Sequence, residues 1–402
     1  MLAARRLTGV TTAAVALALV ATPPASATLA ARLTRALTVP GVSWSRTAAI
    51  VVDLASGRRL YGRNPGRSLK PASNEKLTVA LAALDELGPA FRIPTDVLGE
   101  GRLDGHVWRG TLVLKGYGDP TLSRRDLLRL ADAIRRGGIR RLTRPVEGDE
   151  SYFDRRRTAP GWKPSFYKIE CPPLSALVVD RARVGGRTVE DPALSAARAF
   201  SRALRSVGVR VPRGARKGTA AEDAVRLARV SSPRLERLLV RMNRKSDNFL
   251  AETLLKELGA REAGRGTTAA GARVVVSALR ARSLPLRGVR IVDGSGLSRY
   301  DRLTARSIAA LLVSAWRDRR VRWRLFLSLP LAGVEGTLAD RLERPPARRH
   351  VRAKTGTTSS ASALSGYVRR RLVFSVLQNA SPIPWWWARY GQDRFVQILA
   401  GL

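Results

Sequence analysis

Apolar residues recur at helical spacing over most of the second half of the chain, whereas its middle carries short apolar runs separated by glycines. Spacings of three and four residues predict amphipathic helices, and short runs bounded by Gly, Pro or Asp predict strands. The predicted helices cover residues 29–37, 73–88, 123–136, 193–207, 234–242, 249–258, 267–279 and 305–316, and a last helix contains Trp386 and Phe395. The predicted strands cover residues 48–54, 59–61, 95–98, 107–108, 111–115, 349–354, 363–368 and 372–378, and one lies near Val146.

Changes in this pattern mark candidate domain boundaries. From about Phe91 the chain consists of short strands, glycine-rich turns and two helices, and a mostly helical pattern resumes near residue 225. We therefore expect an accessory lobe of mixed strands and helices at 91–224, inserted into a larger, discontinuous domain at 28–90 and 225–402. A chain of 402 residues, 45% of them hydrophobic, is long enough to give each part its own core.

The first 27 residues have the pattern of a secretory signal. Arg5 and Arg6 supply the positive start, residues 10–20 form an apolar run, and Ala-Ser-Ala at 25–27 is a small-x-small cleavage site. The run is too short to cross a bilayer comfortably, so cleavage after Ala27 is predicted, and a retained N-terminal anchor is the alternative. We expect an exported protein that works outside the cytoplasm, in the periplasm or cell wall or as a secreted form.

Candidate chemistry begins with Ser73 and Lys76, in the stretch Pro-Ala-Ser-Asn-Glu-Lys that leads into an apolar helix. Residues three apart share a helix face, so the Lys76 amine can reach the Ser73 hydroxyl. A serine attacks at neutral pH only when a neighbour takes its proton, and burial beside a second cation lowers the pKa of a lysine toward that role. A second Ser-x-x-Lys, from Ser165 to Lys168, follows a proline and is interpreted as a loop without chemistry.

Two later motifs support this interpretation. Ser-Asp-Asn at 246–248 is the only Ser-x-Asn of the chain, and Lys-Thr-Gly at 354–356 is its only Lys-Thr-Gly. In this order, the three motifs are the signature of class A β-lactamases and penicillin-binding proteins. The chain resembles the low-molecular-mass, class C type penicillin-binding proteins of the D-alanyl-D-alanine carboxypeptidase/endopeptidase family, which have a large insertion after the Ser-x-x-Lys helix. Blocks similar to that family lie at 71–77, 118–122, 243–248 together with 251–252, 293–299, 336–338 and 353–357.

The resemblance implies an α/β penicillin-binding/β-lactamase-like transpeptidase fold, an antiparallel sheet flanked by helices, with a mixed α/β lobe inserted. It also implies a serine-type D-Ala-D-Ala carboxypeptidase, or endopeptidase, that acts on peptidoglycan peptide stems and takes β-lactam antibiotics as covalent inhibitors. Ser246 lies 173 positions after Ser73, a separation larger than a compact β-lactamase has. A β-lactamase-like hydrolase and a non-catalytic wall-binding module on the same fold remain the alternatives.

By the same resemblance, four residues carry the acyl-transfer chemistry. Ser73 is expected to attack the carbonyl between two D-alanines, and Lys76 to take its proton. Ser246 is expected to relay a proton to the leaving amine, while Asn248 hydrogen-bonds the substrate amide.

The substrate-binding residues come from the strand and the loop that follow. Lys354 and Thr355 are expected to hold the terminal carboxylate of the substrate. Thr357 is expected to complete the oxyanion hole with its backbone N–H, together with that of the nucleophile. Arg299, in the glycine-rich loop at 293–299, is a further candidate for a carboxylate contact. The loop has no Gly-Lys-Ser/Thr ending, so a phosphate-binding turn is disfavoured.

Composition excludes several other classes. Lys and Arg number 72 against 32 acids, a net charge of +40, but 63 of the 72 are Arg spread along the chain, without a nucleic-acid-binding motif. We expect no nucleic-acid function, only electrostatic association with an anionic wall. His106 and His350 are the only histidines and no Gly-x-Ser-x-Gly occurs, which argues against a Ser-His-Asp hydrolase. With Cys171 as the single cysteine, no internal disulfide, metal or other cofactor is expected.

Three residues in the predicted lobe have two interpretations. Asp149, Tyr152 and Asp154 could bind a substrate side chain or could be solvated turn residues, and the second interpretation is favoured because acids in turns usually serve the backbone. The single cysteine is expected to be a small buried filler. The sequence leaves open whether carboxypeptidase or endopeptidase action dominates, which residue occupies the third peptide position, and the oligomeric state.

Overall fold

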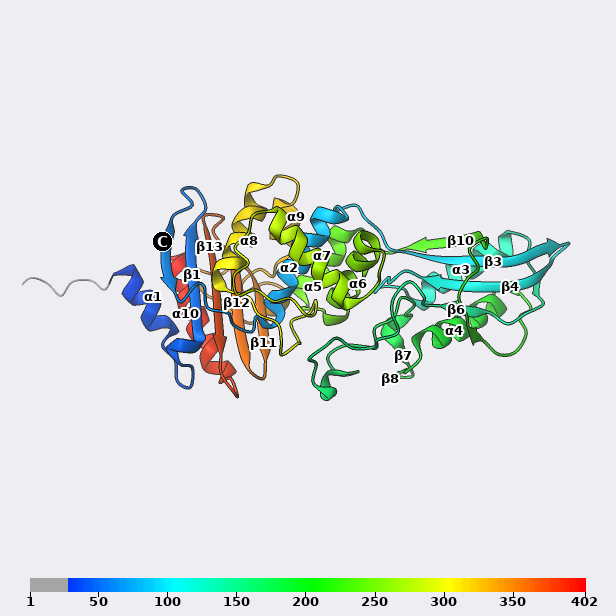
Figure 1. The fold of residues 1–402 in the computed structure, drawn as a ribbon, viewed down its shortest axis with the longest axis horizontal. Coiled ribbons are helices and arrows are strands. Elements are labelled where there is room, and N and C mark those ends of the chain that lie inside the picture. The colour runs from blue at the N-terminus through cyan, green and yellow to red at the C-terminus, as the bar shows by residue number, and fades with distance from the viewer. Residues whose placement is uncertain (1–27) are drawn as a thin grey trace, which may run out of the picture.

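The computed structural model describes residues 28–402, so the predicted signal at 1–27 lies outside the described residues. The described chain forms an elongated molecule (Figure 1). One sheet and most of the helices make up a larger domain, and a second large sheet lies in a lobe at the far end of the molecule. Within residues 28–402, no helix is long and apolar enough to cross a membrane.

The larger domain is built on a five-stranded antiparallel sheet. In spatial order its strands are β11 (Val351–Thr358), β12 (Ala361–Val368), β13 (Leu372–Asn379), β1 (Thr47–Asp53) and β2 (Arg59–Arg63). Successive side chains alternate between two cores: Ile50 and Leu377 belong to one, while Val51 and Val376 belong to the other. Because both faces of the sheet are covered, β12 is buried at every residue and β13 at all but its last.

Helices cover both faces of this sheet (Figure 1). On the outer face lie α1 (Leu29–Leu37) and α10 (Trp385–Ala400), which pack against each other. The inner face, toward the lobe, carries α2 (Lys76–Glu86), α5 (Leu235–Arg244), α6 (Asn248–Ala263), α7 (Thr268–Ala281), α8 (Ala305–Arg317) and α9 (Arg322–Ser328). Helix α2 is central, since every side chain from Lys76 to Leu84 is buried. The described residues also contain five short 3₁₀ turns: η1 (Trp44–Arg46), η2 (Ala72–Glu75), η3 (Pro164–Phe166), η4 (Asp180–Ala182) and η5 (Gly336–Leu338).

The lobe contains a mixed sheet and two helices. Its strands, in spatial order, are β10 (Val225–Ser231), β3 (Pro94–Asp104), β4 (Val107–Gly116), β6 (Glu147–Asp149) and β9 (Arg216–Lys217), with β5 (Arg141–Leu142) beside β4. Helices α3 (Arg124–Arg136) and α4 (Pro192–Ser206) pack together against this sheet and share its apolar core. A small ribbon is formed by β7 (Arg183–Val184) and β8 (Arg187–Thr188).

Several elements differ from the sequence prediction. The short strands β5, β7, β8 and β9 were not predicted, and β4 joins two predicted strands. Strand β10 pairs with β3, so the lobe sheet continues to Ser231, beyond the predicted boundary at residue 224. This strand is mostly exposed, and it belongs to the lobe through its pairing with β3 and through Ala228, which is buried in the lobe core. Helix α9 was not predicted, because seven residues are too few to show a helical period. The other predicted helices and strands are observed with their ends shifted by a few residues.

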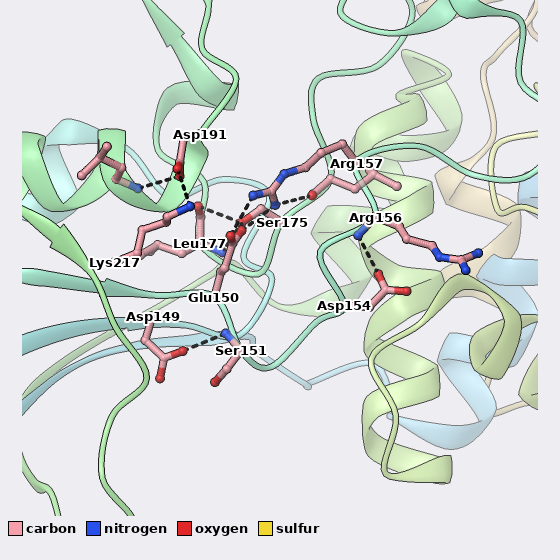
Figure 2. A network of polar contacts seen from close by, with 12 residues as sticks. Asp149, Glu150, Ser151, Asp154, Arg156, Arg157, Ser175, Leu177, Asp191 and Lys217 are labelled. Carbon is pink, nitrogen blue, oxygen red and sulfur yellow. Dashed lines mark hydrogen bonds and ion pairs between the residues drawn. The ribbon is translucent and has the colours of Figure 1, made fainter.

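Figure 2 shows a polar network within the lobe, centred on the acidic residues at 149–154. The Arg157 guanidinium donates to both carboxylate oxygens of Glu150, with 2.7 Å between Nη2 and Oε1. Asp149 is fully buried, pairs with Lys115 and accepts from two backbone N–H groups, so its interpretation as a solvated turn residue is wrong.

The other two lobe residues contact α6. The Tyr152 hydroxyl lies 3.4 Å from Glu257 Oε1, and Asp154 forms an ion pair with the fully buried amine of Lys256. Lys256 also donates to the carbonyl of Arg156. These contacts hold the lobe on the larger domain.

Removing the partner of a buried ammonium should destabilise the protein. Asp154→Ala leaves Lys256 without its carboxylate, and we expect the free energy of unfolding in urea to fall by about 3 kcal/mol. Adding Lys256→Met, which removes the buried charge, should recover part of the loss. Asp104→Ala breaks the solvent-exposed pair with Arg109 and serves as the control, with little change expected. Equal effects of Asp154→Ala and Asp104→Ala would contradict this account.

Candidate active site

Ser73 lies in η2, three residues before α2 begins at Lys76. The predicted helix start at Ser73 is therefore wrong, because the preceding residue, Ala72, has a left-handed φ of 47° and the chain enters the helix through a tight 3₁₀ turn. The turn still places the two side chains on one side, with 2.9 Å between Lys76 Nζ and Ser73 Oγ.

The Lys76 amine is completely buried and has three oxygen neighbours. Besides Ser73 Oγ, Nζ lies 2.8 Å from Asn248 Oδ1 and 2.7 Å from the carbonyl oxygen of Ser295. Burial lowers the pKa of Lys76 to about 8, although nearby acids, Asp293 first among them, oppose the shift. When Lys76 is neutral, the amide and carbonyl oxygens can accept its two N–H bonds, which leaves the lone pair directed at the Ser73 hydroxyl.

Ser246 and Asn248 lie at the junction of α5 and α6. Ser246 has φ of 54°, an uncommon conformation for a residue with a side chain, and its Oγ accepts from Lys354 Nζ at 2.9 Å. Asp247 caps α6 by accepting from the backbone N–H of the helix and is held by two hydrogen bonds from Arg181 of the lobe. Asn248 is the first residue of α6, and its Nδ2 donates to the carbonyl of Glu170.

Strand β11 carries the Lys-Thr-Gly motif along the edge of the sheet. Lys354 points toward the inner helices, whereas Thr355 and Thr357 lie on the opposite face, where they contact Thr337 at 2.7 Å and Arg389 at 3.2 Å. Burial and the charge of Lys76 lower the pKa of Lys354 well below its usual range.

The outer backbone groups of β11 face away from β12. The N–H of Ala353 donates to the carbonyl of Pro330, outside the sheet. Because an antiparallel strand repeats every two residues, the N–H of Thr357 points to the same outer side. A Cβ added at Gly356 would lie 3.0 Å from the backbone nitrogen of Ser73, so glycine lets the strand pass close to the nucleophile turn.

These elements surround a cavity of about 470 Å³. Of the predicted site residues, Ser73, Ser246, Asn248, Thr355 and Thr357 line it. The amines of Lys76 and Lys354 are buried behind this lining, in contact with the two serines. The structure therefore brings together all three motifs in one site.

Arg299 does not line this cavity. Its guanidinium is exposed, donates to the Tyr300 hydroxyl at 2.7 Å and lies over the Tyr300 ring. The cations that do line the cavity are Lys245, Arg341 and Arg389, none of which the sequence singled out. Nothing marks Arg389 among 63 arginines in the sequence.

The lobe also contributes to the cavity wall through Glu170, which sequence reasoning missed. The adjacent Cys171 is fully buried in a small apolar cluster with Phe249 of α6, next to Leu297. Burial raises the pKa of the Cys171 thiol well above its usual range, so the predicted role as an inert filler is consistent with its surroundings. No group of three or more potential ligands is placed to hold a metal ion within residues 28–402.

Four carboxyl groups, those of Glu75, Glu252, Asp293 and Asp301, are buried behind the nucleophile turn. Burial raises the pKa of Glu75 and Asp301 well above their usual range and that of Glu252 to about 8, and the charge of Asp293 adds to each shift. With a pKa of about 8, Glu252 retains its proton at neutral pH, so the cluster does not place four negative charges beside Lys76.

Glu252 connects this cluster to Lys76 through the loop at 293–299. Its Oε1 accepts from the backbone N–H groups of Ser295 at 2.8 Å and Gly294 at 3.1 Å. Asp293 accepts from two further N–H groups of the loop, both at 2.7 Å. The loop is thereby fixed with its Ser295 carbonyl directed at the Lys76 amine.

A comparison with protein families decides the identity of this arrangement. The model of the D-Ala-D-Ala carboxypeptidase 3 (S13) family matches residues 29–188 and 181–398, nearly all of the described chain. The chain belongs to this S13 family. The predicted family and the predicted serine-type D-Ala-D-Ala carboxypeptidase activity are thereby confirmed.

Individual relatives agree with the S13 assignment. The chain is 32% identical to a D-alanyl-D-alanine carboxypeptidase of Actinomadura sp. (strain R39), over 86% of this chain and 80% of that protein. Its fold is similar to the crystal structure of penicillin binding protein 4 (dacB) from Haemophilus influenzae, with a TM-score of 0.82 at 21% identity, covering 92% of this chain and 98% of the other. The complex of that protein with a novel β-lactam aligns with a TM-score of 0.74 at 23% identity and the same coverage. The predicted fold class is confirmed by this similarity.

The protonation of Lys76 should govern the rate at which this S13 enzyme is acylated. Only the neutral amine can accept the Ser73 proton, and a pKa of about 8 leaves roughly a tenth of it neutral at pH 7. We expect the acylation rate to rise about tenfold per pH unit below pH 8 and to level off above it. Stopped-flow acylation by a chromogenic β-lactam measures this profile. A flat profile in the wild type, or an unchanged slope in Lys76→Met, would contradict the assignment.

Proposed function

We propose that Ser73 is the acylated nucleophile of a serine D-Ala-D-Ala carboxypeptidase/endopeptidase whose substrates are the peptide stems of peptidoglycan. The observation that carries the assignment is the buried Lys76 amine, whose other two neighbours, Asn248 Oδ1 and the Ser295 carbonyl, direct its lone pair at Ser73 Oγ. The second Ser-x-x-Lys has no such setting. Ser165 is exposed, and the Lys168 amine pairs with Glu190.

Acylation follows from these positions. Ser73 Oγ attacks the carbonyl carbon of the penultimate D-Ala while its proton passes to neutral Lys76. The oxygen of the tetrahedral intermediate is stabilised by the backbone N–H groups of Ser73 and Thr357, each worth about 3 kcal/mol in comparable acyl enzymes. The C–N bond then breaks, and the amine of the terminal D-Ala leaves with a proton relayed by Ser246, whose hydroxyl oxygen accepts a hydrogen bond from Lys354 Nζ. Water hydrolyses the ester and regenerates the serine.

Substrate binding follows from the cations around the cavity. Lys354 and Thr355 would hold the terminal carboxylate, with Arg389 at the rim in place of the predicted Arg299. Asn248 would bind the substrate amide through Nδ2, which requires that this group exchange the Glu170 carbonyl for the substrate. The carbonyl of Glu170 therefore occupies a hydrogen-bonding position that the substrate backbone can take.

β-Lactams should acylate the same serine. The Haemophilus influenzae neighbour with a β-lactam in its structure supports this proposal. Incubation with a labelled penicillin should add one adduct to the peptide that contains Ser73, and Ser73→Ala should abolish it. Ser165→Ala, the matched change in the other Ser-x-x-Lys, should label as the wild type does. Mass spectrometry of the digested protein measures both, and an adduct that persists in Ser73→Ala would overturn the assignment.

We also propose that the protein is exported and loses residues 1–27. The support is the sequence pattern alone: two arginines, an apolar run and the Ala-Ser-Ala site. N-terminal sequencing of protein recovered from outside the cytoplasm should begin at Thr28. An intact Met1 in that fraction would indicate a retained anchor, and recovery only from the cytoplasm would contradict export.

The net charge of +40 supports association with an anionic wall. Exposed charges attract over distances of about 8 Å at physiological ionic strength, so this contribution should weaken as salt rises. The chemistry at Ser73 takes place beside buried groups and should depend much less on salt.

A further inference from the structure

The first two turns of α10 expose a group of aromatic side chains that the acylation chemistry does not use. Trp385, Trp386, Trp387 and Tyr390 are 44% to 65% exposed, although large aromatic residues usually have most of their surface buried. We call these four residues the aromatic patch. From residue 381 to residue 400, all exposed large apolar side chains belong to it.

The aromatic patch is continuous with the rim of the active-site cavity. Arg389 lines the cavity, and its Nη2 lies 3.2 Å from Thr357 Oγ1. The same guanidinium lies over the Trp385 ring, 4.9 Å from the ring centroid. The segment before α10 is joined to the β11–β12 turn by a backbone hydrogen bond from Ile383 to Ser359. Arg389 thus links the aromatic patch directly to strand β11, which is proposed to bind the substrate.

The patch is held in an ordered arrangement. Trp385 packs edge-on against Trp386, and Trp387 packs edge-on against Tyr390, with 6.1 Å between the ring centroids in each pair. Arg394 lies over the Tyr390 ring, as Arg389 does over Trp385. Rings that are already fixed lose little conformational freedom when a ligand binds. The free energy of binding a ligand is therefore more favourable than it would be for flexible apolar side chains.

The rest of α10 argues against insertion into a membrane. An interfacial helix places a long apolar face into the bilayer. In α10 that face, with Phe395, Val396 and Leu399, is buried against the sheet, as the position of the helix on the outer face of the domain indicates (Figure 1). Only the aromatic rings of the first two turns remain available, and they adjoin the cavity that receives the peptide stem.

We propose that the aromatic patch binds the sugar backbone of the glycan strand to which the peptide stem is attached. This rests on the proposed function, because the stem must occupy the cavity for the glycan to reach α10. The C–H-lined face of a pyranose ring is apolar and slightly positive, and it stacks on the negative face of an indole or phenol ring. The indole N–H groups and Arg394 supply donors for the sugar hydroxyl and acetyl oxygens.

The experiment compares the wild type with the double variant Trp386→Ala/Trp387→Ala on two substrates: a free peptide stem, and the same stem attached to a glycan oligomer. Neither residue lines the cavity or contacts a residue of the acylation machinery. The double variant should acylate with penicillin and turn over a free peptide ending in D-Ala-D-Ala within about twofold of wild type. For the same stem on a purified glycan oligomer, KM should rise about tenfold with kcat unchanged, as expected for the loss of two stacking contacts. Trp323→Ala, an exposed tryptophan on α9, is the matched control and should change neither substrate.

A change in salt concentration distinguishes binding by the aromatic patch from attraction by the positive charge. Salt screens attraction between charges, but the sugar backbone is uncharged. The wild type should therefore retain some binding to walls at high salt, and the double variant should lose this remaining binding. Sedimentation with purified walls at low and high salt measures both contributions.

Three results would overturn the proposal. An unchanged KM for the glycan-linked stem would show that the patch does not bind sugar, and equal losses on both substrates would show a structural role. Loss of binding to phosphatidylglycerol vesicles, with an unchanged KM for the glycan-linked stem, would assign the patch to a membrane surface. Failure of the wild type to turn over either substrate would instead reject the proposed function.

Discussion

A buried ammonium group, that of Lys76, imposes the arrangement on which the site depends. Burying a charge is unfavourable unless polar groups replace its water. The three oxygens that do so come from Ser73 in η2, Asn248 on α6 and Ser295 in the loop at 293–299, segments separated by more than 40 residues along the chain. Satisfying one amine therefore fixes three segments relative to each other. The partly protonated carboxyl cluster behind them maintains the loop without holding the amine permanently charged.

The inserted lobe takes part in the same arrangement. Its segment around Glu170 and Cys171 packs on Phe249 and supplies a wall of the cavity. Arg181 of the lobe holds Asp247, whose side chain caps α6. A movement of the lobe would therefore be transmitted to Asn248, the first residue of α6, which contacts the Lys76 amine. The lobe is a structural part of the site.

The sequence predicted the features that depend on local chemistry and missed those that depend on contacts between distant segments. The buried strands, the apolar α2 and the three motifs are all visible as periodicity or as rare combinations of residues. Strand β10 was not predicted, and its residues were placed in the larger domain, because its pairing with β3 and its packing in the lobe core are contacts between distant segments. No sequence pattern indicates that Arg389, on a helix at the end of the chain, contacts Thr357. Nor does any pattern indicate that Glu252 accepts hydrogen bonds from a loop about 40 residues away. Arg299 was predicted from its motif position, but a motif position does not determine the direction of a side chain, and its guanidinium contacts Tyr300 and does not line the cavity.

The position of β11 at the edge of the sheet has a consequence for solubility. An open edge presents unpaired backbone groups that can template association with another chain. In this protein few backbone groups of β11 are open to a second chain. The carbonyl of Pro330 accepts a hydrogen bond from the N–H of Ala353. The outer backbone groups nearer Thr357 face a cavity lined by the lobe and by several cationic side chains. A cationic border repels a second copy of a chain with a net charge of +40 but admits an anionic peptide terminus. The cationic cavity that covers this edge should therefore disfavour association of two copies through β11.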